Sequence, residues 1–249
     1  MSTKALTIGL PTPAPLRLSQ AALFLDLDGT LAPIAARPQD VRPDPRRTRL
    51  LEGLNAGLDG RLAVVTGRSL ADVDRILEET IVCVAAVHGL VRRDGDGGVH
   101  QPPVHPGLPR AVAALKDFAA RDSGLIVEEK GPSVALHFRL ARQHAGAARE
   151  LAHHLAAETG LALQDGDMVE ELRTPGPTKG DSIRSFMQSP AFAGAQPVFV
   201  GDDITDEHGF EEAERLGGYG VLVTAHRKSH ARFGLPDVEA VMAWLEAAR

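Results

Sequence analysis

With 249 residues, of which 43% are hydrophobic, the chain is long enough for one large domain or two modest ones with a substantial buried core. Its net charge of −6 and its scattered lysines and arginines argue against a nucleic-acid or membrane-surface partner. Cys83 is the single cysteine, which excludes an internal disulfide, and its apolar neighbours (residues 81–87) predict a buried thiol.

The N-terminal segment, residues 1–20, contains Pro11, Pro13 and Pro15 and has no sustained apolar run. This composition predicts a loose leader rather than a signal peptide. No apolar run elsewhere approaches the roughly 20 residues that are needed to span a bilayer. We therefore expect a soluble, cytoplasmic and monomeric protein.

The first predicted strand, residues 21–25, is apolar without a helical period, as is typical of a strand buried on both faces of a parallel sheet. It leads into the sequence Asp-Leu-Asp-Gly-Thr, in which strand alternation would direct Asp26 and Asp28 to one side and Leu27 to the core. One interpretation is an ordinary solvated turn. The other is a reactive pair, in which Asp26 is a nucleophile that forms an aspartyl-phosphate and Asp28 moves the proton of the leaving group.

Strands and helices then alternate, which predicts a doubly wound parallel α/β sheet. Asp44 followed by Pro45 predicts a helix start, and Ser69 with Asp72 predicts another. The predicted elements are a helix at 45–58, a strand at 62–66, a helix from 69, a strand at 81–87 and a hairpin at 91–100 that turns at 94–98.

Residues 102–109 contain four prolines and predict a linker, after which the pattern changes. The predicted elements are a helix at 108–121, strands at 125–129 and 134–139, a helix at 145–158, and two strands within 161–172 that turn at 165–167. This is an α+β layer inserted into the larger sheet. We expect a core domain of residues 1–104 and 177–249, and an inserted cap domain of residues 105–176.

After Pro175-Gly176-Pro177 the strand and helix pattern returns, with a helix from Lys179, a strand at 197–201, a helix from Asp206, a strand at 219–223 and a helix at 238–247. Thr66, at the end of the second strand, could donate its hydroxyl to a phosphoryl oxygen, and Lys179 could neutralise the phosphate. Taken alone, Thr66 would be interpreted as an ordinary helix-approach residue and Lys179 as an ordinary solvated surface lysine.

A second acidic group follows the strand at 197–201, with four acids, Asp202, Asp203, Asp206 and Glu207, within six residues. These charges repel one another unless a cation or a helix N-terminus relieves them. Mg²⁺ prefers oxygen ligands, and we expect Asp26, Asp202 and the backbone carbonyl of Asp28 to be its protein ligands. Asp203 and Asp206 would then hold waters or Lys179 around the ligands.

These motifs, in this order, resemble those of the haloacid dehalogenase-like phosphatases: Asp-x-Asp-Gly-Thr, a strand-end Thr, a Lys before a helix, and Gly-Asp-Asp-x-Thr-Asp. The insert lies between the second and third motifs, where the α/β cap of that superfamily occurs. More narrowly, residues 65–69, 128–130, 137–139, 179–180 and 201–207 are similar to the trehalose-6-phosphate phosphatase family, and the similarity extends over nearly the whole chain.

The resemblance implies a Rossmann-like core with an α+β cap, and hydrolysis of trehalose 6-phosphate through an aspartyl-phosphate. It implies Mg²⁺ as the cofactor and a small sugar phosphate as the substrate. It also suggests one protein partner, trehalose-6-phosphate synthase. The implied residues are Asp26 (nucleophile), Asp28 (acid/base), Thr66 and Lys179 (phosphate), Asp26, Asp28 and Asp202 (Mg²⁺), Glu128, Lys130 and Glu171 (sugar), and Gly67, Arg68 and Arg139 (further substrate contacts).

Other interpretations stay open. The chemistry could act on another sugar phosphate, because few cap residues specify the sugar, or the chain could be a catalytically retired regulatory domain of a trehalose-synthesising complex. Arg68 and Arg139 are equally explained as structural salt bridges. Without the resemblance, Glu128 and Lys130 are explained as an exposed ion pair. His153-His154 has no spaced partner for a metal site and is interpreted as a solvated helix face. Val91 and Thr174 depart from the family pattern, which usually has Glu and Pro there.

Overall fold

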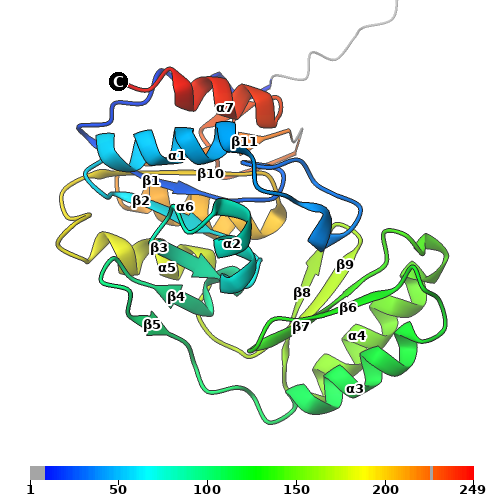
Figure 1. Ribbon diagram of the computed structural model, residues 1–249. Coiled ribbons are helices and arrows are strands. Elements are labelled where there is room, and N and C mark those ends of the chain that lie inside the picture. Colours follow the sequence, from blue (N-terminus) through cyan, green and yellow to red (C-terminus); the bar gives the residue numbers. More distant parts are fainter. Residues whose placement is uncertain (1–8, 225–226) are drawn as a thin grey trace, which may run out of the picture.

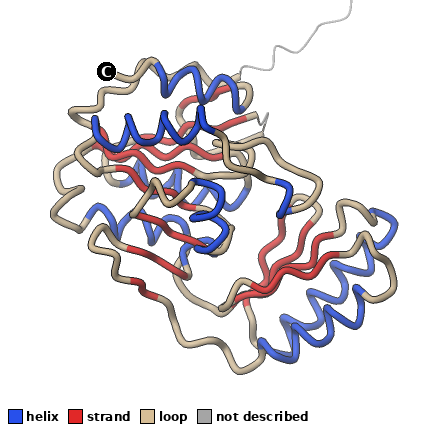
Figure 2. Tube along the Cα trace, in the orientation of Figure 1, coloured by secondary structure: helices blue, strands red, loops and turns tan. Residues whose placement is uncertain are grey.

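The computed structural model describes residues 9–224 and 227–249 and contains two sheets, each with its own helices (Figures 1 and 2). The larger sheet has eight strands in the order β12-β11-β10-β1-β2-β3-β4-β5. Its strands are β1 Ala21–Leu25, β2 Leu62–Val65, β3 Cys83–Ala86, β4 Val91–Arg93, β5 Val99–His100, β10 Gln196–Gly201, β11 Tyr219–Val223 and β12 Phe233–Leu235. All neighbours pair in parallel except β3 with β4 and β4 with β5. The predicted α/β sheet is therefore confirmed.

Helices cover both faces of this sheet, which is why its central strands are apolar throughout. Leu23 and Leu25 of β1 point to one face, while Phe24 points to the other. The first face packs against α1 Pro45–Gly57, α2 Leu70–Leu77 and α7 Val238–Glu246. The second face packs against α5 Lys179–Met187 and α6 Glu207–Arg215, and in Figure 1 α1 and α7 lie above the sheet.

The helix starts follow the capping pattern of the sequence. The side chains of Asp44 and Ser69 accept backbone hydrogen bonds at the starts of α1 and α2. At α5, Thr178 and Asp181 form a reciprocal capping box, so that Lys179 is the first helical residue. This cap fixes the position from which the Lys179 side chain enters the core.

Strand β1 is the point at which the strand order reverses. It pairs in parallel with β2 on one side and with β10 on the other, and the later strands continue outward in both directions. Helices that leave neighbouring strands in opposite directions open a crevice at the carboxyl ends of those strands. The fold therefore places an opening at Asp26, Thr66 and Asp202, which follow β1, β2 and β10.

The smaller sheet is antiparallel, in the order β6-β7-β9-β8, and consists of β6 Ile126–Glu129, β7 Ser133–His137, β8 Ala162–Gly166 and β9 Val169–Arg173. Helices α3 Leu108–Ala119 and α4 Ala145–Thr159 cover its face away from the larger sheet (Figure 1). Leu136 and Leu172 pack against these helices. The alternate residues Ala135 and Glu171 are paired across β7 and β9 on the opposite face, which is directed toward the larger sheet.

The prediction of a loose N-terminal leader was wrong over its described part; residues 1–8 of that prediction lie outside the described residues. Leu16 is buried, and its carbonyl accepts a hydrogen bond from the backbone of Arg249. The indole of Trp244 donates to the carbonyl of Ala14 at 2.8 Å. Prolines remove N–H donors but not carbonyl acceptors, and the carbonyls of this segment bind Trp244 of α7 and Arg249, which follows that helix.

Two smaller features differ from the expected elements. The first is strand β12, which was not predicted because three residues at a sheet edge give too short an alternating pattern. The predicted turn at 165–167 lies later, because Asp165 and Gly166 pair within β8 and the chain reverses at Asp167 and Met168, which has φ +59°. Among the described residues, none of the helices is both long and apolar enough to cross a membrane.

Candidate active site

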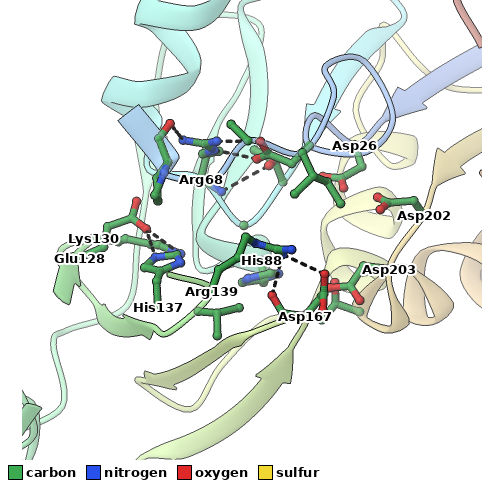
Figure 3. Close-up of a pocket in the computed structure, with 18 of the residues that line it drawn as sticks. Asp26, Arg68, His88, Glu128, Lys130, His137, Arg139, Asp167, Asp202 and Asp203 are labelled. Carbon is green, nitrogen blue, oxygen red and sulfur yellow. Dashed lines mark hydrogen bonds and ion pairs between the residues drawn. The ribbon is translucent and has the colours of Figure 1, made fainter. Parts of the chain in front are cut away.

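Polar residues from both sheets line one cavity of about 320 Å³ (Figure 3). The residues that the sequence predicted for a site and that line it are Asp26, Asp28, Thr66, Gly67, Arg68, Glu128, Lys130, Arg139, Lys179, Asp202 and Asp203. Glu171 does not line the cavity but contacts Lys130, and Asp206 contacts Lys179. The fold thus brings together residues that are up to 177 positions apart in the sequence, from Asp26 to Asp203.

Gly29 explains how the two acidic motifs come so close. Its φ is +77°, and a Cβ atom there would lie 2.1 Å from Oδ2 of Asp202. Only glycine satisfies both the left-handed backbone and the absence of space. Leu27 points into the core, as predicted, so that Asp26 and Asp28 face the cavity.

Lys179 is buried among carboxylates. Its Nζ lies 2.6 Å from Oδ1 of Asp206, to which it donates a hydrogen bond, and 3.1 Å from Oδ1 of Asp26. The second contact has the distance of an ion pair but not the direction of a hydrogen bond. Burial disfavours the ammonium, but Asp206 and Asp26 outweigh it and raise the pKa of Lys179 above its usual value. The lysine is therefore a fixed positive charge.

Asp206 acts as a scaffold for the same site. While Oδ1 accepts from Lys179, Oδ2 accepts from the backbone N–H groups of Asp202 and Asp203 at 2.9 Å each. Its side chain is fully buried. Both of its oxygens accept hydrogen bonds. Asp26 and Asp202 are therefore the carboxylates with an oxygen that is free to bind a ligand.

The carboxylates of Asp26, Asp202 and Asp206 form a group that fits a divalent cation, since one oxygen of each lies within 4.8 Å of the others. Within the described part of the chain, Oδ1 of Asp26 and Oδ1 of Asp202 are buried without a hydrogen-bond partner. Burial, with the neighbouring Asp206 carboxylate, raises the pKa of Asp202 to about 7, and burial raises the pKa of Asp26 well above its usual range although Lys179 opposes it. Lys179 is shared between Asp26 and Asp206, so one lysine faces three carboxylates, and a bound cation would supply the missing positive charge.

Arg68 holds the second acid of the first motif. Its Nε and Nη2 donate to the two carboxylate oxygens of Asp28 at 2.6 Å each, and Nη1 donates to the carbonyl of Pro38 at 2.6 Å. A bidentate pair of this kind fixes the direction of the carboxylate. Of the two interpretations left open for Arg68, the structure shows a salt bridge, and one that borders the cavity.

The smaller sheet contributes a wall of alternating charges. Nζ of Lys130 lies 2.7 Å from Oε2 of Glu171 but 3.9 Å from Glu128, whose Oε2 is 2.7 Å from Nε2 of His137. Burial disfavours these charges, but the contact with Lys130 holds the pKa of Glu171 well below its usual range. The Lys130 side chain is only 7% exposed, so the interpretation as an exposed ion pair of Glu128 and Lys130 was wrong.

Three cavity residues with titratable side chains were missed in the sequence: His88, His137 and Asp167. Asp167 accepts from Nη2 of Arg139 at 2.8 Å, which gives Arg139 a salt bridge at the cavity edge. His137 could have been found by alternation along β7. It lies on the same strand face as Ala135, and Ala135 is the residue of β7 that pairs with Glu128. His88 has no such signal, because it follows a strand in an irregular segment.

The remaining sequence expectations concern residues away from the cavity. Val91 is buried at the start of β4, and Thr174 accepts the backbone N–H of His105 at 3.1 Å. Thr174 thereby joins the two segments that connect the sheets. His153 and His154 are exposed on α4, as expected for a solvated helix face.

A model of the trehalose-phosphatase family matches residues 24–239. The trehalose-6-phosphate phosphatase of Escherichia coli is 38% identical over 239 residues, which cover 94% of this chain and 89% of that protein. The chain belongs to the trehalose-phosphatase family. A probable trehalose-phosphate phosphatase of Sinorhizobium fredii is 36% identical, with 90% of this chain and 86% of that protein covered.

Solved structures agree with this family. The crystal structure of a trehalose-6-phosphate phosphatase-related protein superimposes with a TM-score of 0.74 at 27% identity and covers 90% of this chain and 95% of that chain. A subclass IIB sugar phosphatase of the haloacid dehalogenase superfamily superimposes with a TM-score of 0.59 at 15% identity, covering 88% of this chain and 94% of that one, which is a likeness of fold alone. The family member described here therefore has the haloacid dehalogenase-like fold that the motifs predicted.

Proposed function

We propose that the chain is a Mg²⁺-dependent phosphatase that hydrolyses trehalose 6-phosphate to trehalose and phosphate. The observation that carries the proposal is the buried carboxylate of Asp26, with one oxygen lacking a hydrogen-bond partner beside Lys179, in a cavity whose opposite wall contains Glu128 and Lys130. Membership of the trehalose-phosphatase family supports the substrate. Phosphate release from trehalose 6-phosphate should stop with EDTA and resume when excess Mg²⁺ is added.

In the proposed reaction, a carboxylate oxygen of Asp26 attacks phosphorus, and the bond from phosphorus to the sugar oxygen breaks. Asp28 gives that oxygen its proton, and then takes a proton from the water that attacks phosphorus and releases phosphate from Asp26. Lys179 and the Thr66 hydroxyl hold phosphoryl oxygens. Mg²⁺ bound by Asp26, Asp202 and the backbone carbonyl of Asp28 would supply positive charge to the phosphoryl group.

We also propose that residues 105–176 act as a cap domain over a core of residues 1–104 and 177–249. The charged face of the small sheet borders the cavity, where it can exclude water from the phosphoenzyme. In this account Glu128, Lys130 and Glu171 bind the sugar, and Gly67, Arg68 and Arg139 complete the substrate contacts. A cytoplasmic location, a monomeric state and an association with trehalose-6-phosphate synthase stay predictions.

Two rival functions share this fold. A phosphatase of another sugar phosphate would use the same core residues, and only the cap would differ. A regulatory domain that has lost its catalytic activity has no need to keep a nucleophile next to a buried lysine and a cation site. In this chain Asp26 lies next to Lys179, and Asp26 and Asp202 belong to the carboxylate group that fits a cation. The geometry therefore favours an active enzyme over a regulatory domain.

Binding of Mg²⁺ should strengthen as the pH rises from 6 to 8. The pKa of Asp202 is raised to about 7, so below that pH a proton occupies the carboxylate and must leave before the cation binds. Well below pH 7, the dissociation constant should change by at least about 10-fold per pH unit, because Asp26, whose pKa is also raised, must lose its proton as well. Titration calorimetry at several pH values checks this, with Asp202→Asn as a variant that should bind Mg²⁺ weakly at all of them. An affinity independent of pH would remove Asp202 from the ligand set.

Replacing Glu128, Lys130 or Glu171 with alanine should lower kcat/KM for trehalose 6-phosphate. Losing one hydrogen bond to a charged group costs about 1.5–3 kcal/mol, or roughly 10- to 150-fold. The loss for p-nitrophenyl phosphate should be smaller, because that ester does not reach the cap. Equal losses on both substrates would mean that these residues support the fold or cap closure instead of binding the sugar.

A further inference from the structure

Residues 87–89 are three consecutive residues with φ above zero, and His88 among them lines the cavity. Val87 has φ +49°, His88 has φ +54° and Gly89 has φ +101°. The left-handed region is costly for a β-branched residue and uncommon for histidine. Such strain persists where the surrounding structure determines it and is concentrated at functional sites.

Two backbone hydrogen bonds hold this segment against the loop after β2. The N–H of Val87 donates to the carbonyl of Arg68 at 2.8 Å, and the N–H of His88 donates to the carbonyl of Thr66 at 2.9 Å. The strained segment is therefore attached to the loop that carries the proposed phosphate contact, Thr66. Any displacement of His88 would be transmitted to that loop.

The imidazole of His88 rests on Gly67. A Cβ atom at Gly67 would lie 2.4 Å from both Cε1 and Nε2 of the ring. The φ of Gly67 is not in the left-handed region, so its backbone alone does not demand glycine. Gly67 is thus explained by the need to seat His88 against the loop.

His88 also faces the small sheet. Its Nε2 lies 3.5 Å from Oε2 of Glu171, the oxygen that accepts from Lys130 at 2.7 Å, and its side chain is 14% exposed. In the view of Figure 3, His88 lies between Asp26 and Asp202 on one side and Glu128 and Lys130 on the other. Burial lowers the pKa of His88 although the Glu171 carboxylate opposes this, and Lys179 and Lys130 add to the lowering, so the imidazole is neutral at neutral pH.

We propose that His88 is a positioning residue that couples the sugar-binding wall of the cap to the phosphate-binding loop of the core. Nε2–H of its neutral ring would direct the Glu171 carboxylate, and through it Lys130, toward the sugar, while the ring keeps the Thr66–Gly67 segment in place. The left-handed backbone at residues 87–88 directs the His88 side chain toward the small sheet, and Gly67 leaves the space that the ring occupies. The proposal rests on the proposed function only in requiring a sugar phosphate as substrate.

A double-mutant cycle tests the coupling, with His88→Asn, Glu171→Gln and both together. Asparagine tolerates φ above zero, and glutamine keeps the shape of the glutamate. Each single variant should lower kcat/KM about 10-fold on the sugar phosphate that the wild type hydrolyses best, with a smaller loss on p-nitrophenyl phosphate. The double variant should lose no more than the worse single variant. His154→Asn, on an exposed face of α4, is the matched control and should behave as wild type.

Losses that multiply to about 100-fold in the double variant would overturn the coupling, as would a fully active His88→Asn. If His88→Asn does not fold, His88→Gly relieves the strain, and Glu171→Gln should then have little further effect in that background. A wild type that prefers a sugar phosphate other than trehalose 6-phosphate contradicts the proposed substrate alone, because the cycle is then measured on the preferred substrate. A wild type that hydrolyses no sugar phosphate would overturn both proposals.

Discussion

Replacing Asp26 with asparagine should lower kcat for sugar-phosphate hydrolysis by at least about 10⁴-fold while the protein stays folded. The amide cannot form the aspartyl-phosphate, and it is a poor ligand for a divalent cation. In the metal-free protein the same change should raise the thermal midpoint at pH 8. The folded structure raises the pKa of Asp26 well above its usual range, which means that the ionised carboxylate destabilises the folded state as the pH rises. The neutral asparagine side chain does not have this cost.

Initial rates with Mg²⁺ and a thermal scan in EDTA measure the two effects on one preparation. Mass spectrometry must exclude deamidation of the asparagine back to aspartate. Asp59→Asn, at an exposed position outside the site, provides the control and should change neither quantity. Substantial turnover by a verified Asp26→Asn protein would remove Asp26 from the role of nucleophile.

Lys179→Met should have the second-largest effect, on both stability and rate. Lys179 is 2% exposed and pairs with Asp206 and Asp26, so its loss leaves buried carboxylates without a cation. Breaking a buried ion pair from one side costs about 3–5 kcal/mol, and losing one electrostatic contact to the reacting group lowers kcat by about 100-fold or more. Denaturant unfolding in EDTA and initial rates in Mg²⁺ measure the two quantities.

The pH dependence separates this explanation from a general packing defect. The destabilisation should shrink from pH 8 to pH 5.5, because Asp26, whose pKa is already raised, can take up a proton and then needs no cation. Lys116→Met, which removes an exposed lysine paired with Glu129, should have little effect at either pH. A loss for Lys179→Met that is the same at both pH values would contradict the charge account.

Much of the fold was predictable because its signals are local. The apolar runs before Asp26 and Asp202 identified β1 and β10, and Ser69 and Asp44 identified two helix starts. Because parallel strands end at one edge of a sheet, these strand ends also predicted which core residues meet. The motif order then indicated the family before any distance was known.

The part of the site on the small sheet could not be predicted to the same depth, because its contacts depend on the register between strands. Lys130 shares a strand face with Glu128 yet pairs more closely with Glu171, which β7 separates from it in the sheet. His88 depends on a left-handed backbone that no residue pattern announces. The N-terminal segment was misread because its packing on α7 uses carbonyl groups, which every residue has.

The most direct test of the account is the rate of phosphate release from a panel of sugar phosphates, measured as kcat/KM with Mg²⁺ present. The panel should contain trehalose 6-phosphate, other disaccharide phosphates and hexose 6-phosphates. In the proposed account the phosphate contacts of Asp26, Thr66 and Lys179 are the same for every sugar phosphate, so a preference among them should come chiefly from Glu128, Lys130 and Glu171. We expect trehalose 6-phosphate to be hydrolysed with the highest kcat/KM, by about 10-fold or more over each alternative. A higher value for another sugar phosphate, or equal values across the panel, would contradict the proposed function.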